Sequence, residues 1–338
     1  ATGDALAASG VLARAVDARG RPFQVSVADL APDAARSTEA DLTVAVGRAD
    51  PATDLALAGD GRPASESAFA VARELADSGG PTDEPTVALA LAGVLADGRV
   101  ADGPVVDTAR EAGIERRPGV AVPTPDLADG LAHSTLVHAP FSGGVETGDV
   151  ETGDVETDDL VDSLALLTDD DRVDPTALDD EDRRRVASLV ALRTVGADDV
   201  PPRAGEAVER FLRPFAGGPF GTVGGYADVL DAVARERPGT GVALALGHDV
   251  APAALDAWRT HARRAHAAVR DATTGRYDGL YVARAETPDA PVGTMARLTH
   301  DYRSPEPLTL AVTEGAAAAV ADDAVDLAGP LSAAAAVT

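Results

Sequence analysis

Short apolar runs alternate with helical patterns through the first hundred residues, and few folds accommodate that alternation. Helical patterns are predicted over 6–19, 65–76 and 86–95, and strands at Phe23 to Val27, Leu42 to Val46 and Leu55 to Ala58. Short apolar strands separated by helices favour a parallel sheet with both faces covered. The pattern therefore predicts an α/β fold for the N-terminal part of the chain.

The carboxyl ends of these strands form the expected ligand site, because ligands of parallel sheets bind beyond that edge. Asp4 precedes the first predicted helix, whereas Arg48 and Asp60 each follow a predicted strand. We therefore expect Asp4, Arg48 and Asp60 to lie on one rim of the sheet.

An acidic five-residue repeat at 144–159 divides the chain. A segment of this composition buries little apolar surface, and it lacks the ligand spacing and the terminal Glu of a calcium-binding EF-hand. We interpret it as a linker. The predicted domains are an α/β domain at 1–143, the acidic linker at 144–159, a helical connector at 160–271 and a smaller α/β domain at 272–338.

The second half of the chain carries further predicted elements. Helices are predicted at Arg183 to Arg193, Ala227 to Arg235, Pro252 to Ala272 and Val292 to Leu298, and strands at Val242 to Leu246, Leu280 to Ala283 and Leu308 to Val312. The glycine-rich segment 215–226 precedes a helix, where exposed amides can bind phosphate. Because Pro219 removes a donor and no Lys follows, a hinge and helix start is the favoured interpretation.

The amino-acid composition indicates the environment in which the protein works. There are 56 acidic residues against 29 basic ones, no Lys, and a formal charge of −27 over 338 residues. Such an excess keeps a protein hydrated at very high salt, so we expect a cytoplasmic protein of an extreme halophile; an acidic protein that binds basic partners is the alternative. The absence of Cys excludes a thiolate nucleophile and a cysteine zinc site. No membrane span is predicted, and because the first residue is not Met we expect native residues before Ala1.

Basic residues gather on the predicted helix at 252–272. Arg259, Arg263 and Arg270 lie near Trp258, a combination that could follow a nucleic-acid backbone. In so acidic a chain, however, such arginines more often pair with carboxylates. The spacing of the histidines along the chain is poor for a metal site, and we predict none from them.

The order of these elements resembles the DHH phosphoesterase superfamily, and in particular the archaeal relatives of the RecJ single-stranded-DNA exonuclease. The resemblance covers nearly the whole chain, as a DHH-type domain, a helical connector and the start of a DHH-associated domain. It implies two Mn²⁺ ions held by an Asp-x-Asp motif, a later Asp, an Asp-His-His motif and a fourth Asp, which together activate water for phosphodiester hydrolysis.

Several of these implied ligands are replaced in the sequence. Thr2-Gly3-Asp4 stands at the first motif, Arg48 at the second, Asp60-Gly61-Arg62-Pro63 at the Asp-His-His motif, and Asp97 at the fourth. The resemblance therefore leaves Asp4, Asp60 and Asp97 as residual metal ligands. Arg48 and Arg62 should repel a divalent metal and pair with these carboxylates instead.

The resemblance implies a catalytically degenerate RecJ-like protein that serves as a scaffold or partner subunit in DNA replication or repair. Its partners would be a GINS-like complex or an active RecJ-like paralogue, with single-stranded DNA or RNA as a further ligand. One alternative is an active Mn²⁺-dependent single-strand-specific exonuclease or phosphoesterase with one metal on Asp4, Asp60 and Asp97. Another is a two-domain α/β protein with an unrelated small-molecule role.

Overall fold

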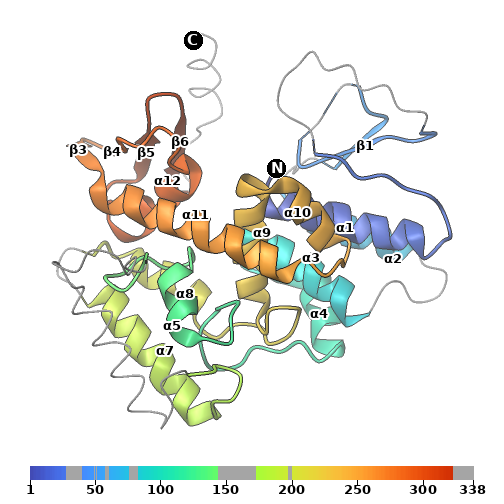
Figure 1. Ribbon diagram of the computed structural model, residues 1–338, viewed down its shortest axis with the longest axis horizontal. Helices are drawn as coiled ribbons and strands as arrows, with labels where there is room; N and C mark the ends of the chain where they lie inside the picture. The colour runs from blue at the N-terminus through green and yellow to red at the C-terminus, as the bar shows by residue number, and fades with distance from the viewer. Residues whose placement is uncertain are drawn as a thin grey trace. The chain divides into compact units, whose positions relative to one another are not determined.

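The computed structural model describes residues 1–27, 40–48, 50, 52–57, 61–75, 83–143, 173–196 and 200–322. Contacts divide the chain into two compact units, each assembled from separate stretches of sequence (Figure 1). Unit 1 comprises Ala1–Arg117, Ala121–Pro125 and Pro214–Arg259, and unit 2 comprises Pro118–Val120, Asp126–Arg213 and Thr260–Thr338. The acidic repeat and the C-terminal Ala-rich segment lie outside the described residues.

Unit 1 is a helical bundle with one small sheet. Its elements are α1 (Gly3–Asp17), β1 (Val44–Val46), β2 (Leu55–Leu57), α2 (Ala64–Leu75), α3 (Glu84–Ala96), α4 (Gly103–Glu111), α9 (Val223–Glu236), α10 (Pro238–Ala245) and the start of α11 (Ala251–Asp271). The central helix is α3, in which every residue from Thr86 to Val94 is buried. A helix that is apolar all round must be covered on all sides, and α1, α2, α4 and α9 pack against α3. β1 and β2 pair in parallel, with Val44 opposite Leu55.

Unit 2 combines helices with a four-stranded sheet. Its elements are α5 (Leu127–His133), α7 (Asp180–Val195), α8 (Ala204–Phe211), the end of α11, β3 (Thr273–Tyr277), β4 (Leu280–Arg284), α12 (Val292–Tyr302), β5 (Leu308–Val312) and β6 (Ala317–Ala321). The strand order is β3-β4-β5-β6. Only β4 and β5 run parallel, and α12, which connects them, packs on β5 and β6. This βαβ arrangement confirms the predicted small α/β unit near the C-terminal end.

Most predicted elements are confirmed, but two predicted strands are wrong. Phe23 to Val27 forms no strand, and the Phe23 side chain is 42% exposed. Val242 to Leu246 lies in and just after helix α10. A short apolar run fits a buried helix as well as a strand, and α10 begins at Pro238, a residue favoured in the first helical turn.

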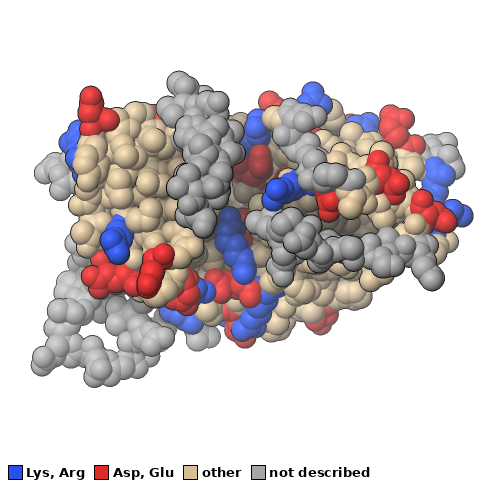
Figure 2. Space-filling view, turned by 90° about the horizontal axis from the view of Figure 1, so that it is seen from above, with Lys and Arg blue, Asp and Glu red and all other residues tan. Residues whose placement is uncertain are grey.

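Charged side chains of both signs are visible on one face of the molecule (Figure 2). On the face drawn in Figure 2, acidic and basic side chains lie next to one another in several places. Among the described residues, no helix combines the length and apolar character that crossing a bilayer requires.

Candidate functional site

The first candidate ligand, Asp4, lies in the opening turn of α1. Thr2 caps this helix, with its hydroxyl oxygen 3.2 Å from the Ala5 backbone nitrogen. The Asp4 side chain is buried, and its two carboxylate oxygens accept hydrogen bonds from the backbone N–H groups of Ala64 at 2.7 Å and Ser65 at 2.9 Å. Asp4 thus binds the N-terminus of α2, where unpaired N–H groups and the helix dipole favour a negative charge.

The end of β1 lies against the same turn of α1. Gly47 has a φ of +85°, and a Cβ at this position would lie 2.9 Å from the Cβ of Ala5. Glycine is therefore required at this position both by its backbone conformation and by the close approach. The segment Gly61 to Pro63 leads directly into α2, so the segments around Gly47 and Pro63 both lie beside the turn that carries Asp4.

Asp97 is the C-terminal cap residue of α3 and lies within the electrostatic reach of Asp4. Burial raises its pKa, and the negative charge of Asp4 raises it further, with a smaller contribution from Asp231. Arg99 opposes this effect, because its Nε lies 3.0 Å from an Asp97 carboxylate oxygen. Asp4 and Asp97 are therefore close enough to influence one another electrostatically.

In the part of the chain that the structure describes, Arg48 and Arg62 do not form the predicted pairs with Asp4 or Asp97. Both arginines are exposed there and form no ion pair with Asp4 or Asp97. The Asp4 carboxylate already accepts hydrogen bonds from backbone amides of α2, and the Asp97 carboxylate accepts one from Arg99. Asp60 lies outside the described residues.

The described donor set does not fit the two-ion manganese centre that the resemblance implies. Of the implied carboxylate ligands, the described residues include Asp4 and Asp97, and both have other partners: the amides of Ala64 and Ser65 for Asp4, and Arg99 for Asp97. No group of three or more His, Asp or Glu side chains within the described ranges is arranged to hold a metal ion.

The predicted basic surface on α11 is only partly available to a ligand. Arg259 forms an ion pair with Asp256 at 3.5 Å, and Arg270 donates to the backbone oxygen of Ser142 at 2.7 Å. Arg263 is half-buried. Trp258 is fully buried and donates to Asp228 at 2.8 Å, so it cannot stack on a nucleic-acid base.

A pair of histidines in unit 2, the fully buried His266 and the partly buried His138, was not predicted. Nδ1 of His138 and Nδ1 of His266 are 3.0 Å apart, and the two rings stack with their centroids 5.2 Å apart. Nε2 of His266 lies 3.1 Å from the backbone oxygen of Ser134 and must carry a proton to donate to it. Nδ1 of His266 is then the acceptor, and Nδ1 of His138 is the donor. These residues are 128 positions apart, so no local pattern could pair them.

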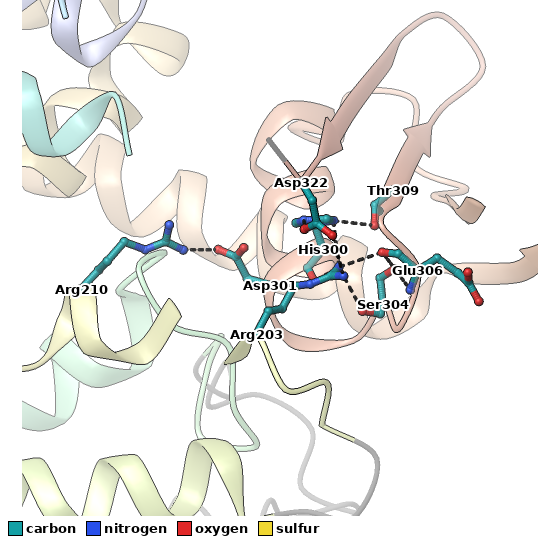
Figure 3. Close-up of polar contacts among 8 residues, drawn as sticks. All are labelled: Arg203, Arg210, His300, Asp301, Ser304, Glu306, Thr309 and Asp322. Atoms are coloured by element: carbon teal, nitrogen blue, oxygen red, sulfur yellow. Dashed lines mark hydrogen bonds and ion pairs between the residues drawn. The ribbon is translucent and has the colours of Figure 1, made fainter. Parts of the chain in front are cut away.

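A second polar network in unit 2 centres on Arg203 (Figure 3). Its guanidinium donates to the backbone oxygens of His300 at 3.3 Å, Ser304 at 3.3 Å and Glu306 at 2.8 Å, all at or just beyond the end of α12. It also pairs with Asp322 at 3.3 Å. A cation is favourable at a helix C-terminus, and here it joins the start of α8 to the residue that follows β6.

His300 in this network is held neutral. Burial lowers its pKa, and the Arg203 charge lowers it further. Nε2 of His300 lies 3.2 Å from an Asp322 oxygen and carries the proton, which leaves Nδ1 to accept from Arg203 and Thr309, each at 3.2 Å. Because all these groups have partners, the network is structural rather than a site for a reacting ligand.

Substitution of Arg203 by methionine is expected to lower the free energy of unfolding by about 3 kcal/mol, because several acceptors around a largely buried guanidinium lose their donor. The matched control is Arg276→Met, which removes the exposed pair with Glu306 and should cost no more than about 1 kcal/mol. Urea denaturation in molar KCl, followed by circular dichroism, measures both. Equal losses in the two variants would contradict the role given to Arg203.

The fold and these sites define a mixed α/β protein of two units. The family model that matches residues 272–338 is described as the C-terminal domain of the uncharacterized protein rrnAC1427. The protein of that name from Haloarcula marismortui is 54% identical to this chain over 336 residues, which cover 99% of the chain and 82% of the relative. The chain belongs to this rrnAC1427 family.

Proposed function

We propose that the chain is a RecJ-like member of the DHH phosphoesterase superfamily with a degenerate catalytic centre. In this proposal it acts as a scaffold or partner subunit in DNA replication or repair, in the cytoplasm of a halophilic archaeon. The observation that carries the proposal is the convergence of separate segments on Asp4. The end of β1, the start of α2 and Asp97 all lie near this carboxylate, and the proposal assigns the implied metal-ligand motifs to these segments.

The chemistry of the converging residues supports loss of hydrolysis. Asp4 accepts hydrogen bonds from the amides of Ala64 and Ser65, and Asp97 pairs with Arg99 at 3.0 Å, so a metal ion would compete with these partners. Arg48 and Arg62 flank the same segments and bring fixed positive charge where the resemblance expects an Asp and a His. Each substitution opposes the binding of a divalent cation.

The alternative function is an active Mn²⁺-dependent single-strand-specific exonuclease or phosphoesterase with one metal. The electrostatic coupling of Asp4 and Asp97 favours it, because two neighbouring carboxylates are the minimum that such a site needs. Asp60, the third ligand of this alternative, immediately precedes Gly61.

Manganese titration separates the two functions. Calorimetry in molar KCl is expected to show no two-ion uptake by the wild-type protein, and end-labelled single-stranded DNA and RNA should remain uncleaved. The double variant Arg48→Asp and Arg62→His should gain manganese binding, because it restores a carboxylate and an imidazole beside Asp4. The exposed variant Arg73→Gln serves as a control for the loss of positive charge.

The outcomes distinguish the scaffold from the exonuclease. Binding with cleavage by the wild-type protein would replace the scaffold proposal with the exonuclease. If neither protein binds manganese although both are folded, the DHH assignment itself fails. The scaffold role is tested separately by co-elution with a purified GINS-like complex or an active RecJ-like paralogue in molar KCl, and separate elution from both would contradict it.

A further inference from the structure

Two arginines in unit 2 converge beside the histidine pair. Arg270, near the end of α11, donates to the backbone oxygen of Ser142 at 2.7 Å. Arg303, which follows α12, donates to the backbone oxygen of Val269, the residue before Arg270. A Cβ at Gly143 would contact both the Arg270 guanidinium and the Cβ of His266, so Arg270 lies beside the histidine pair, and the Val269 contact brings Arg303 to the same end of α11. The charges of both arginines also help to lower the pKa of His138.

This cluster is positive in a strongly acidic protein. Burial is the main reason that the pKa of His138 falls to about 3, and the charges that add to the effect are those of Arg303 and Arg270, with no carboxylate opposing them. Neither arginine forms an ion pair with a carboxylate in the described ranges. Other arginines of the same unit do form such pairs, namely Arg203, Arg210 and Arg276.

Helix capping explains only part of this arrangement. Arg303 stabilises the last turn of α11 through Val269, as a cation at a helix C-terminus should. A guanidinium has five N–H donors, and the backbone contact of each arginine uses one of them. Both arginines are exposed, so their remaining donors face water. Two like charges held together in this way cost energy that a bound anion would offset.

The histidine pair adds an acceptor to these donors. Because Nδ1 of His138 donates to His266, Nε2 of His138 keeps its lone pair and has no further hydrogen-bond partner in the described residues. An oxyanion that carries its own proton could accept from the arginines and donate to this nitrogen. Inorganic phosphate keeps at least one proton near neutral pH, and a phosphate monoester has one in its monoanionic form, whose pKa is about 6, whereas a phosphodiester has no proton to donate.

We propose that Arg270, Arg303 and His138 form a binding site for a phosphate group, with preference for inorganic phosphate or a monoester over a diester. Guanidinium groups suit this ligand because their planar array of donors matches two phosphate oxygens. The site belongs to unit 2 and does not depend on the function proposed for the Asp4 region of unit 1.

The test is titration calorimetry of the full chain in molar KCl with potassium phosphate as the probe. Molar salt screens charges beyond about 3 Å, so saturable heat would report direct contacts. The double variant Arg270→Gln and Arg303→Gln is expected to bind at least tenfold more weakly. Arg284→Gln is the matched control, because Arg284 is also exposed, in the same unit and without a described ion-pair partner.

A second double variant controls for the possibility that the Gln substitutions weaken binding by unfolding the protein. The change of both residues to Lys retains the charge but removes the planar donors, and it should weaken phosphate binding less than the Gln pair does. No saturable binding by the wild-type protein, or equal binding by the wild-type and Gln proteins, would overturn the proposal. An oligonucleotide without terminal phosphates provides the diester arm. Tighter binding of that probe would overturn the preference for a monoester and identify a nucleic-acid backbone as the source of the phosphate.

Discussion

Alanine at position 225 is expected to destabilise unit 1 by about 3 kcal/mol or more. Gly225 lies in the first turn of α9, and a Cβ there would meet the carbonyl carbon of Val122 at 2.6 Å and the nitrogen of Pro123 at 2.7 Å. These are backbone atoms, so no side chain can rotate away. Thr222 also donates to the Val122 oxygen at 2.9 Å, which holds the two segments together.

Thermal and urea denaturation in molar KCl would measure this loss. The matched control is Gly239→Ala in α10 of the same unit, where a Cβ would meet no atom within 4 Å. That change should leave stability unaltered or raise it by up to about 1 kcal/mol, because Ala favours helix over Gly. If the two variants were equally stable, the packing of α9 on the segment 121–125 would be wrong.

Acid is expected to unfold the protein through the pair of His138 and His266. Burial is the main cause of the low pKa of both imidazoles, which is about 3 for His138 and well below the usual value for His266. The surrounding charges, from Arg303 and Arg270 on His138 and from Arg270 and His133 on His266, disfavour protonation further. Both rings are therefore neutral in the folded protein near neutral pH.

The direction of this pH dependence is set by the unfolded chain, in which each histidine takes up a proton below a pKa of about 6.5. The unfolded state then binds more protons than the folded state, so stability falls as the pH drops below that value. At pH 5 the contribution of His138 alone is about 2 kcal/mol, and His266 adds a loss of the same sign.

Urea unfolding between pH 7 and pH 5 would measure this slope above the range where most carboxylates titrate. The double variant His138→Gln and His266→Gln should be less sensitive to pH over this interval, whatever its stability at pH 7. His248→Gln, at an exposed position, should keep the wild-type slope. A double variant with an unchanged slope would show that the pair does not set the acid response.

Local patterns were enough to predict most helices, because their apolar positions recur at helical spacing. The strands β3 and β6 were missed, since the Gly in the middle of Thr-Thr-Gly-Arg-Tyr interrupts a short run and the Ala-rich β6 contains few of the residues that favour strands. β3 pairs with the free edge of β4, and β6 pairs with the free edge of β5. These strands therefore depend on tertiary contacts rather than on local sequence preference. The strand predicted at Val242 to Leu246 failed for the opposite reason, since its apolar run is buried as a helix.

The contacts of Asp4 could not be predicted from the sequence. The rule that ligands bind at strand ends brought Asp4 and Arg48 to one rim, and the structure places Gly47 against the turn that carries Asp4. The hydrogen bonds of Asp4 to Ala64 and Ser65 span about sixty residues and have no sequence signature. The carboxylate that resembles a metal ligand in sequence is, in the fold, the cap of a helix.

Because each unit is built from separate stretches of the chain, the two units cannot be separated by cutting the chain at one point. Unit 2 includes 126–213 and 260–271 as well as the C-terminal range 272–338 that the family model matches. A fragment that began at residue 272 would lose Arg203, whose guanidinium holds the ends of α12 and β6 together, and Arg210, which pairs with Asp301 at 2.6 Å. The C-terminal range should therefore not survive excision as an independent module, and neither unit could be transferred intact to another protein by a single cut in the gene.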